Sequence, residues 1–153
     1  MKKALVVLGV VFLAIVVLAA LVMASGYYML WASEGQAKSY VDRTVPSIVT
    51  GWDAKALVAE SAPELLQVAP PERLQPMFDG FAARLGPLKQ YNGATRERYF
   101  VNLNPWNRFV TFGYVADAAF EKGPAKIRVG IIRRGAQWKI TDFFVVSDAL
   151  MPR

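Results

Sequence analysis

The chain has 153 residues, carries 18 Lys and Arg against 12 Asp and Glu for a net charge of +6, and contains neither histidine nor cysteine. These absences exclude cysteine nucleophiles, disulfides, acylation at a cysteine, Cys/His zinc sites and histidine-based acid–base catalysis. No segment has the acidic spacing of a calcium loop, so we expect neither a metal nor a cofactor.

Residues 4–24 form an uninterrupted apolar run. At about 1.5 Å per residue, a helix of this length spans roughly 30 Å, the thickness of the hydrocarbon core of a bilayer. Tyr27, Tyr28 and Trp31 follow, as is typical of a membrane interface. The sequence therefore predicts that residues 1–33 comprise a cytoplasmic tip, one transmembrane helix and an interfacial aromatic belt, and that residues 34–153 form an extracytoplasmic domain.

Lys2 and Lys3 precede the apolar run. Positive charge beside a first membrane segment favours the cytoplasmic side, which predicts a single-pass protein of the inner membrane with its domain in the periplasm or outside the cell. The alternative is a cleaved secretory signal with Val22-Met23-Ala24 as the cleavage site. Because the apolar part of such signals has about 7 to 15 residues, we favour a retained anchor.

Helical spacing of apolar residues continues over residues 34–49, where we expect Pro46 to kink or interrupt the helix. Asp53 is expected to cap a short helix that reaches Ala59. Ser61 and Glu64 match the capping box S-x-x-E, which predicts a second short helix.

A further helix is predicted after Pro70-Pro71, and it should end at Gly86-Pro87. Pro76 should delay its regular part. The residues expected on its buried face are Leu74, Phe78, Phe81 and Leu85.

Strand patterns then follow, separated by turn signals. A first strand is predicted over residues 88–95, which residues 99–103 either extend or follow, and a loop with an exposed Trp106 is predicted over residues 102–107. In the long strand over residues 109–121, alternation buries Val110, Phe112, Tyr114, Ala116, Ala118 and Phe120. The next strand alternates Ile127, Val129 and Ile131 and turns at Gly135-Ala136. In the last strand, the apolar run over residues 143–146 indicates either a bulge or burial on both faces. The predicted fold class is α+β, with helices packed on a curved antiparallel sheet of about four strands.

Four of these segments resemble the NTF2-like superfamily of cone-shaped α+β domains. They are Tyr114-Val115-Ala116-Asp117, the turn Glu121-Lys122-Gly123, the strand with Ile127, Val129 and Ile131, and Gln137-Trp138-Lys139-Ile140-Thr141-Asp142-Phe143. The resemblance implies a cone whose enzymes place acidic, tyrosyl or histidyl groups inside, for which the candidates here are Tyr40, Asp42, Tyr99, Tyr114, Asp117 and Asp142. Alternation points Tyr114 inward and Asp117 outward, so we predict no catalytic site.

A pocket lined by Tyr114, Trp138 and Phe144, with Trp52 closing the base of the cone, is a hypothesis. The favoured function is a membrane-anchored, non-catalytic envelope protein that pairs with itself or with an envelope partner through a second sheet face carrying Phe109, Val115 and Phe143. The alternative is a cone that binds a small apolar ligand or acts as an isomerase or dehydratase. Contact with anionic lipid or nucleic acid through Arg96, Arg98, Arg133 and Arg134 ranks last, because aromatic residues are not interleaved with these arginines, and we expect no nucleic-acid partner.

Overall fold

The computed structural model describes residues 1–152 of the chain. It divides into two compact units, Met1–Glu34 and Gly35–Arg153. Helix α1 (Lys2–Val49) contributes to both units, and the remaining helices and strands all belong to the second unit.

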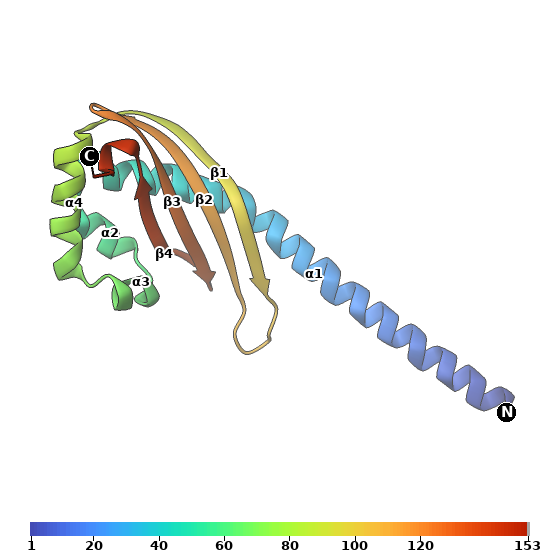
Figure 1. Cartoon of the computed structure of the whole chain (residues 1–153). Helices are drawn as coiled ribbons and strands as arrows, with labels where there is room; N and C mark the ends of the chain where they lie inside the picture. Colours follow the sequence, from blue (N-terminus) through green and yellow to red (C-terminus); the bar gives the residue numbers. More distant parts are fainter. Residues whose placement is uncertain (153) are drawn as a thin grey trace. The chain divides into compact units, whose positions relative to one another are not determined.

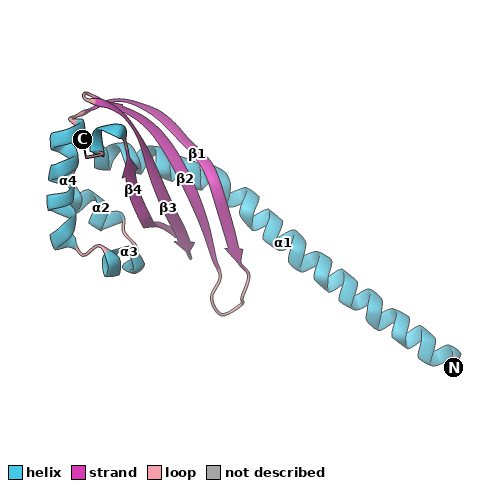
Figure 2. Ribbon diagram, in the orientation of Figure 1, coloured by secondary structure: helices cyan, strands magenta, loops and turns pink. Residues whose placement is uncertain are grey.

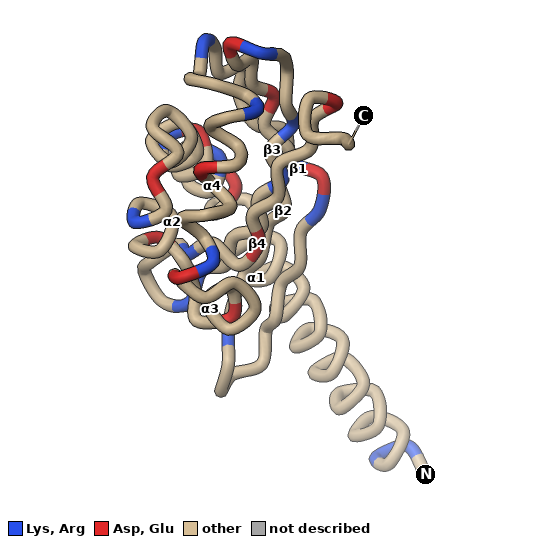
Figure 3. Tube along the Cα trace, turned by 60° about the vertical axis from the view of Figure 1, so that its left-hand side comes forward, with Lys and Arg blue, Asp and Glu red and all other residues tan. Residues whose placement is uncertain are grey.

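The first unit is the apolar part of α1 and is helical from Lys2 onward. Figure 3 shows cations at its beginning and no charged residue along the apolar stretch that follows. Its length and composition allow it to span a membrane, and a signal sequence has the same two properties. Membrane anchoring and orientation therefore stay predictions.

The second unit is built on a four-stranded antiparallel sheet with strand order β1-β2-β3-β4 (Figure 2). Its strands are β1 (Leu88–Asn102), β2 (Phe109–Phe120), β3 (Gly123–Arg134) and β4 (Gln137–Val146). The two tight turns carry Gly123 and Gly135 at positive φ, which glycine adopts without steric cost. The α+β class and the four-stranded meander are confirmed, and of the two alternatives for residues 99–103 the structure has the extension of the first strand.

The inner face of the sheet is formed by the residues that the alternation predicted to be buried. All six residues expected to point inward from β2 are buried, and so are Ile127, Val129 and Ile131 of β3. Within the second unit, α1 packs its apolar stripe into the same core, with Val41, Val45, Ile48 and Val49 fully buried. The strands curve, and the helices of this unit lie on one side of the sheet (Figure 1).

Pro46 does not interrupt α1, which continues to Val49. Proline costs the helix one hydrogen-bond donor. Here it lies one turn from the end, where the Pro46 carbonyl still accepts from the Thr50 N–H at 3.0 Å. Burial of Val45 and Ile48 on either side offsets the lost bond, so the expectation of an interruption was wrong, and the expected kink stays a prediction.

The short helices differ from the prediction in their caps. Asp53 caps α2 (Ala54–Glu60) by accepting from the Lys55 N–H at 2.9 Å, as predicted. Ser61 does not cap α3 (Pro63–Val68): its hydroxyl donates to the Leu57 carbonyl at 2.6 Å and closes α2, and Ala62 is the N-cap of α3. The capping-box prediction is wrong because Pro63 at the first helical position removes one of the N–H groups that a cap would satisfy.

Helix α4 (Pro71–Leu85) begins directly at Pro71 and ends at Gly86, so Pro76 does not delay it. Its residues Leu74, Phe78 and Leu85 are buried. The Trp52 ring stacks on Phe120 at 5.2 Å between centroids, and its indole N–H donates to the Gly86 carbonyl at 3.1 Å.

Phe143 belongs to this core and not to the second sheet face, where the sequence placed it. It is 7% exposed and lies 5.9 Å from the Phe78 ring. The register between β3 and β4 explains the difference: Gly130 pairs with Asp142 and Ile131 with Ile140, so Thr141 is an extra residue. This bulge reverses the alternation, which turns Phe143 inward and Phe144 outward.

The two edges of the sheet are protected differently. At β4, Ser61 forms a bridge to Ile140, and the Ala62 N–H donates to the Ile140 carbonyl at 2.7 Å. Strand β1 has three register shifts within its fifteen residues and carries Arg96, Glu97 and Arg98. Bulges and charges of this kind oppose edge-to-edge pairing of sheets.

Candidate functional site

A row of four residues crosses the outer face of the sheet, which is the face away from the helices. Arg98 of β1 pairs with Gly113 of β2, Gly113 with Gly130 of β3, and Gly130 with Asp142 of β4. These residues alternate with buried neighbours such as Phe112, so the row points outward. At about 4.8 Å between strands, Arg98 and Asp142 stand roughly 14 Å apart across the sheet.

The two glycines let the charged side chains lie flat on the sheet. A β-carbon added at Gly113 would lie 2.6 Å from Cγ and 2.8 Å from Nε of Arg98. One added at Gly130 would lie 2.5 Å from Oδ2 of Asp142 and 2.9 Å from Oγ1 of Thr141. Any larger residue at either glycine would push the charge off the surface, so these positions need glycine for close approach.

Between the charges lies a hollow of about 210 Å³, floored by Gly113 and Gly130. Arg98 and Asp142 line its two sides, and Thr111 is also part of its wall. The lining of the hollow thus includes a cationic and an anionic side chain.

The rest of the outer face mixes exposed apolar side chains with paired charges. Phe100, Phe144 and Val146 are 58%, 60% and 49% exposed. Lys126 pairs with Asp117 at 3.2 Å and Arg128 with Glu97 at 3.9 Å. The outer face therefore combines exposed apolar area with ion pairs between neighbouring strands.

The four residues of the predicted pocket are not brought together. Tyr114 and Trp52 are buried in the core, where Tyr114 lies 6.1 Å from Phe112 and Trp52 contacts Phe120. Trp138 packs on Phe112 at 5.8 Å from the same inner side. Phe144 points to the opposite face of the sheet.

The six catalytic candidates are also dispersed. Tyr40 donates to Glu60 at 2.7 Å, Asp42 binds β1, and Asp117 pairs with Lys126 on the outer face. Tyr114 is in the core, as its alternation predicted. Of the six, Tyr99 and Asp142 line the same hollow, which is the one that Arg98 also lines. The Arg96 guanidinium carbon lies 5.2 Å from the centroid of the Tyr99 ring.

Asp42 is the most heavily engaged of these acids, and it ties α1 to β1. Its Oδ1 accepts from the Tyr91 hydroxyl at 2.8 Å and from the Ala94 N–H at 2.9 Å, and Lys38 pairs with Oδ2 at 2.5 Å. Partial burial opposes ionisation, but these donors outweigh it and lower the pKa of Asp42. Burial and the Asp42 charge raise the pKa of Tyr91, so the phenol stays protonated as a donor. The arrangement is a structural clasp.

Tyr40 lies in a shallow hollow of about 390 Å³, where Trp138, Gln36 and Arg43 are among its neighbours. Burial, followed by the hydrogen bond to Glu60, raises the pKa of Tyr40, so it too stays protonated. A phenol held as a donor to a carboxylate is not poised to act as a base.

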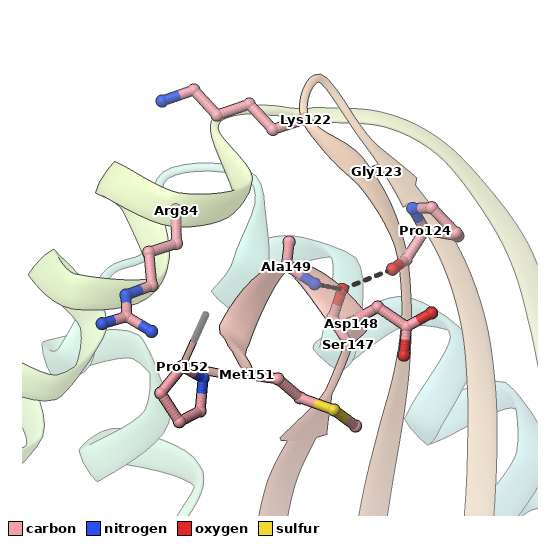
Figure 4. Close-up of a pocket in the computed structure, with 9 residues that line it drawn as sticks. All are labelled: Arg84, Lys122, Gly123, Pro124, Ser147, Asp148, Ala149, Met151 and Pro152. Carbon is pink, nitrogen blue, oxygen red and sulfur yellow. Dashed lines mark hydrogen bonds between the residues drawn. The ribbon is translucent and has the colours of Figure 1, made fainter.

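A depression of about 620 Å³ lies where α4, the β2–β3 turn and the 3₁₀ helix η1 (Asp148–Leu150) meet (Figure 4). Its two cations already donate to backbone carbonyls: Arg84 to Leu150 at 2.9 Å and Lys122 to Ala83 at 2.7 Å. Ser147 donates to the Pro124 carbonyl at 2.7 Å. These contacts hold η1 against α4 and β3 and engage both cations of the depression.

Within residues 1–152, no group of three or more Asp or Glu side chains is placed to hold a metal ion. Figure 3 shows cations and anions interspersed over the second unit.

Comparisons with protein-family models, with curated proteins and with solved structures found no match. The resemblance to the NTF2-like superfamily therefore stays a prediction, and the function is argued from the surface alone.

Sequence reasoning missed the outer row as a unit. Arg98 was noted only as one of several arginines, and Asp142 only as a candidate acid inside the cone. The available signal was that Gly113 and Gly130 occupy outward positions of long strands, since glycine in a strand interior marks a bulge or a close approach.

Proposed function

We propose that this chain is a membrane-anchored, non-catalytic assembly module of a bacterial envelope, and that its outer sheet face pairs with a second copy of the chain. In the proposal the apolar helix crosses the inner membrane with its N-terminus in the cytoplasm, and the second unit is a NTF2-like domain on the other side. The row Arg98–Gly113–Gly130–Asp142 is the observation that carries the proposal.

The row is self-complementary. A two-fold axis parallel to the strands, placed above the boundary between β2 and β3, sets β1 of one copy over β4 of the other. Arg98 of each copy then faces Asp142 of its partner, and within each copy the two glycines let these side chains lie flat on the sheet. Two ion pairs, related by symmetry, would fix the register of the pair.

The same axis suits two copies in one membrane. A rotation about an axis parallel to the strands does not move any residue along the strand direction. The two copies therefore have the ends at which the chain enters the second unit at the same end of the dimer. An axis perpendicular to the strands would put them on opposite sides, where two anchors could not share a bilayer.

The non-catalytic part of the proposal is supported by residue chemistry. The chain contains no histidine and no cysteine, and the tyrosines and aspartates that could act instead are held in separate contacts.

Cysteine crosslinking tests the pairing without background, because the chain has no cysteine of its own. Val115 lies on the outer side of β2, beside the proposed axis, and pairs with Arg128 of β3. We expect V115C in the full chain, oxidised in membranes, to form a disulfide dimer. V68C is the matched control, since Val68 of α3 is 75% exposed but away from the sheet face. Equal crosslinking of the two variants would contradict the proposal.

A further inference from the structure

The β1–β2 loop, residues 103–108, projects from one end of the sheet, and that end is where the chain enters the second unit. Gln36 marks this end, because the Arg133 guanidinium donates to its side chain at 3.1 Å. Arg133 pairs with Val110, which pairs with Val101. Residues 103–108 therefore extend past the strand positions that lie level with Gln36.

Later residues of α1 lie progressively farther from the loop. Asp42 contacts the Ala94 N–H, and Ala94 pairs with Ala116 in the middle of β2. Trp52, just after the helix, stacks on Phe120 at the far end of β2. The chain thus enters the second unit at the loop end and proceeds away from it.

The loop displays one large aromatic side chain in a held conformation. Trp106 is 95% exposed. Asn104 braces the loop: its N–H donates to Asn102 Oδ1 at 3.0 Å, and its Oδ1 accepts from the Trp106 N–H at 3.0 Å. Arg108 follows, exposed, and no acidic residue occurs between residues 102 and 108.

We propose that the β1–β2 loop rests on the bilayer that the apolar helix crosses, with Trp106 seated among the lipid headgroups and Arg108 facing anionic phosphates. This inference rests on the membrane anchoring in the proposed function. Residues 25–35 alone separate the apolar run from Gln36, so the loop end is the end of the sheet that is tethered to the anchor. Tryptophan prefers the interface, where its ring is apolar and its N–H is solvated, and a basic residue beside it is attracted to anionic lipid. The loop would add a second contact that limits tilting of the second unit.

The test uses the full chain reconstituted in vesicles of phosphatidylcholine and phosphatidylglycerol. N107C carries a polarity-sensitive fluorophore next to Trp106, which is kept, and spin-labelled lipid supplies the quencher. A149C is the matched control, because Ala149 is exposed in η1, close to the β2–β3 turn at the other end of the sheet. We expect quenching at N107C to be several-fold that at A149C, and W106S in the N107C background to reduce it towards the control.

The outcomes separate the loop from the anchor. Vesicle flotation with equal quenching at the two sites would overturn the loop contact and leave the anchor intact. Strong quenching at N107C that W106S does not change would overturn the role of Trp106. A chain that fails to float with the vesicles would overturn the anchoring, and the loop contact with it.

Discussion

Removing the Asp42 carboxylate tests how the second unit is held together. In D42A, the Ala94 N–H and the Tyr91 hydroxyl lose their acceptor, and the Lys38 pair is lost with them. Ala94 is only 4% exposed, so its unpaired N–H costs about 1–3 kcal/mol. The half-buried phenol adds up to about 1 kcal/mol because water reaches it in part, and the exposed Lys38 pair adds about 0.3 kcal/mol. We expect D42A to lower the free energy of unfolding by about 2–4 kcal/mol.

The hydrogen bonds and ion pair of Asp42 also make its contribution to the free energy of unfolding depend on pH. The folded pKa of Asp42 lies below its unfolded value of about 3.9, so the stabilisation from ionisation is complete above that value. It is lost as the pH falls through the folded pKa. D42N keeps an oxygen acceptor and loses the charge, so we expect a neutral-pH loss of about 1–2 kcal/mol that shrinks in acid.

The assay is urea unfolding of the full chain in detergent micelles, followed by tryptophan fluorescence, with Trp52 as the buried reporter. The control is D117N, whose partner Lys126 is 65% exposed and whose ion pair is worth about 0–1 kcal/mol. If D42A costs no more than D117N, or if the D42N effect grows in acid, Asp42 does not act as the clasp described above.

Three further substitutions have defined outcomes in the same assay. G130A should cost about 1–3 kcal/mol, because its β-carbon would meet the Asp142 carboxylate, whereas G80A meets no atom within 4 Å in α4 and should gain about 0.5–1 kcal/mol. Equal effects of the two glycine substitutions would contradict the packing of the outer row. W52A removes the fluorescent reporter, so its urea unfolding is followed by circular dichroism. It should cost about 3–5 kcal/mol through loss of the stack on Phe120, and a value under about 1 kcal/mol would show that this ring does not close the core.

The strands were predictable because a half-buried sheet enforces a period of two. The inward positions of β2, from Val110 to Phe120, follow from alternation alone. Phe143 was assigned to the wrong face because a single extra residue, Thr141, reverses the period, and the apolar run around it indicates a bulge without showing where it lies.

The helix boundaries were less predictable because tertiary contacts decide them. Ser61 bonds back to Leu57 instead of forward, and the Ala62 N–H is taken by Ile140, a residue nearly eighty positions later. Pro46 lies inside a helix because the core on either side holds it there. None of these tertiary contacts can be inferred from the residues that flank each helix end.

The outer row was beyond sequence reasoning for a related reason. Arg98, Gly113, Gly130 and Asp142 become neighbours only through three strand registers, two of which contain shifts. Outward glycines could be seen in the sequence, but the charges at each end could not be matched to them.

Charge reversal across the proposed dimer tests the central claim most directly. The measurement is the dimer fraction of the full chain in membranes, read from crosslinking at V115C in R98D, in D142R and in the double variant R98D/D142R. Each single reversal sets like charges against each other at both symmetric contacts, so we expect at least about a tenfold loss of dimer. The double variant restores opposite charges and should recover dimer formation. A double variant as defective as the single ones, or single variants without effect, would contradict pairing through this face.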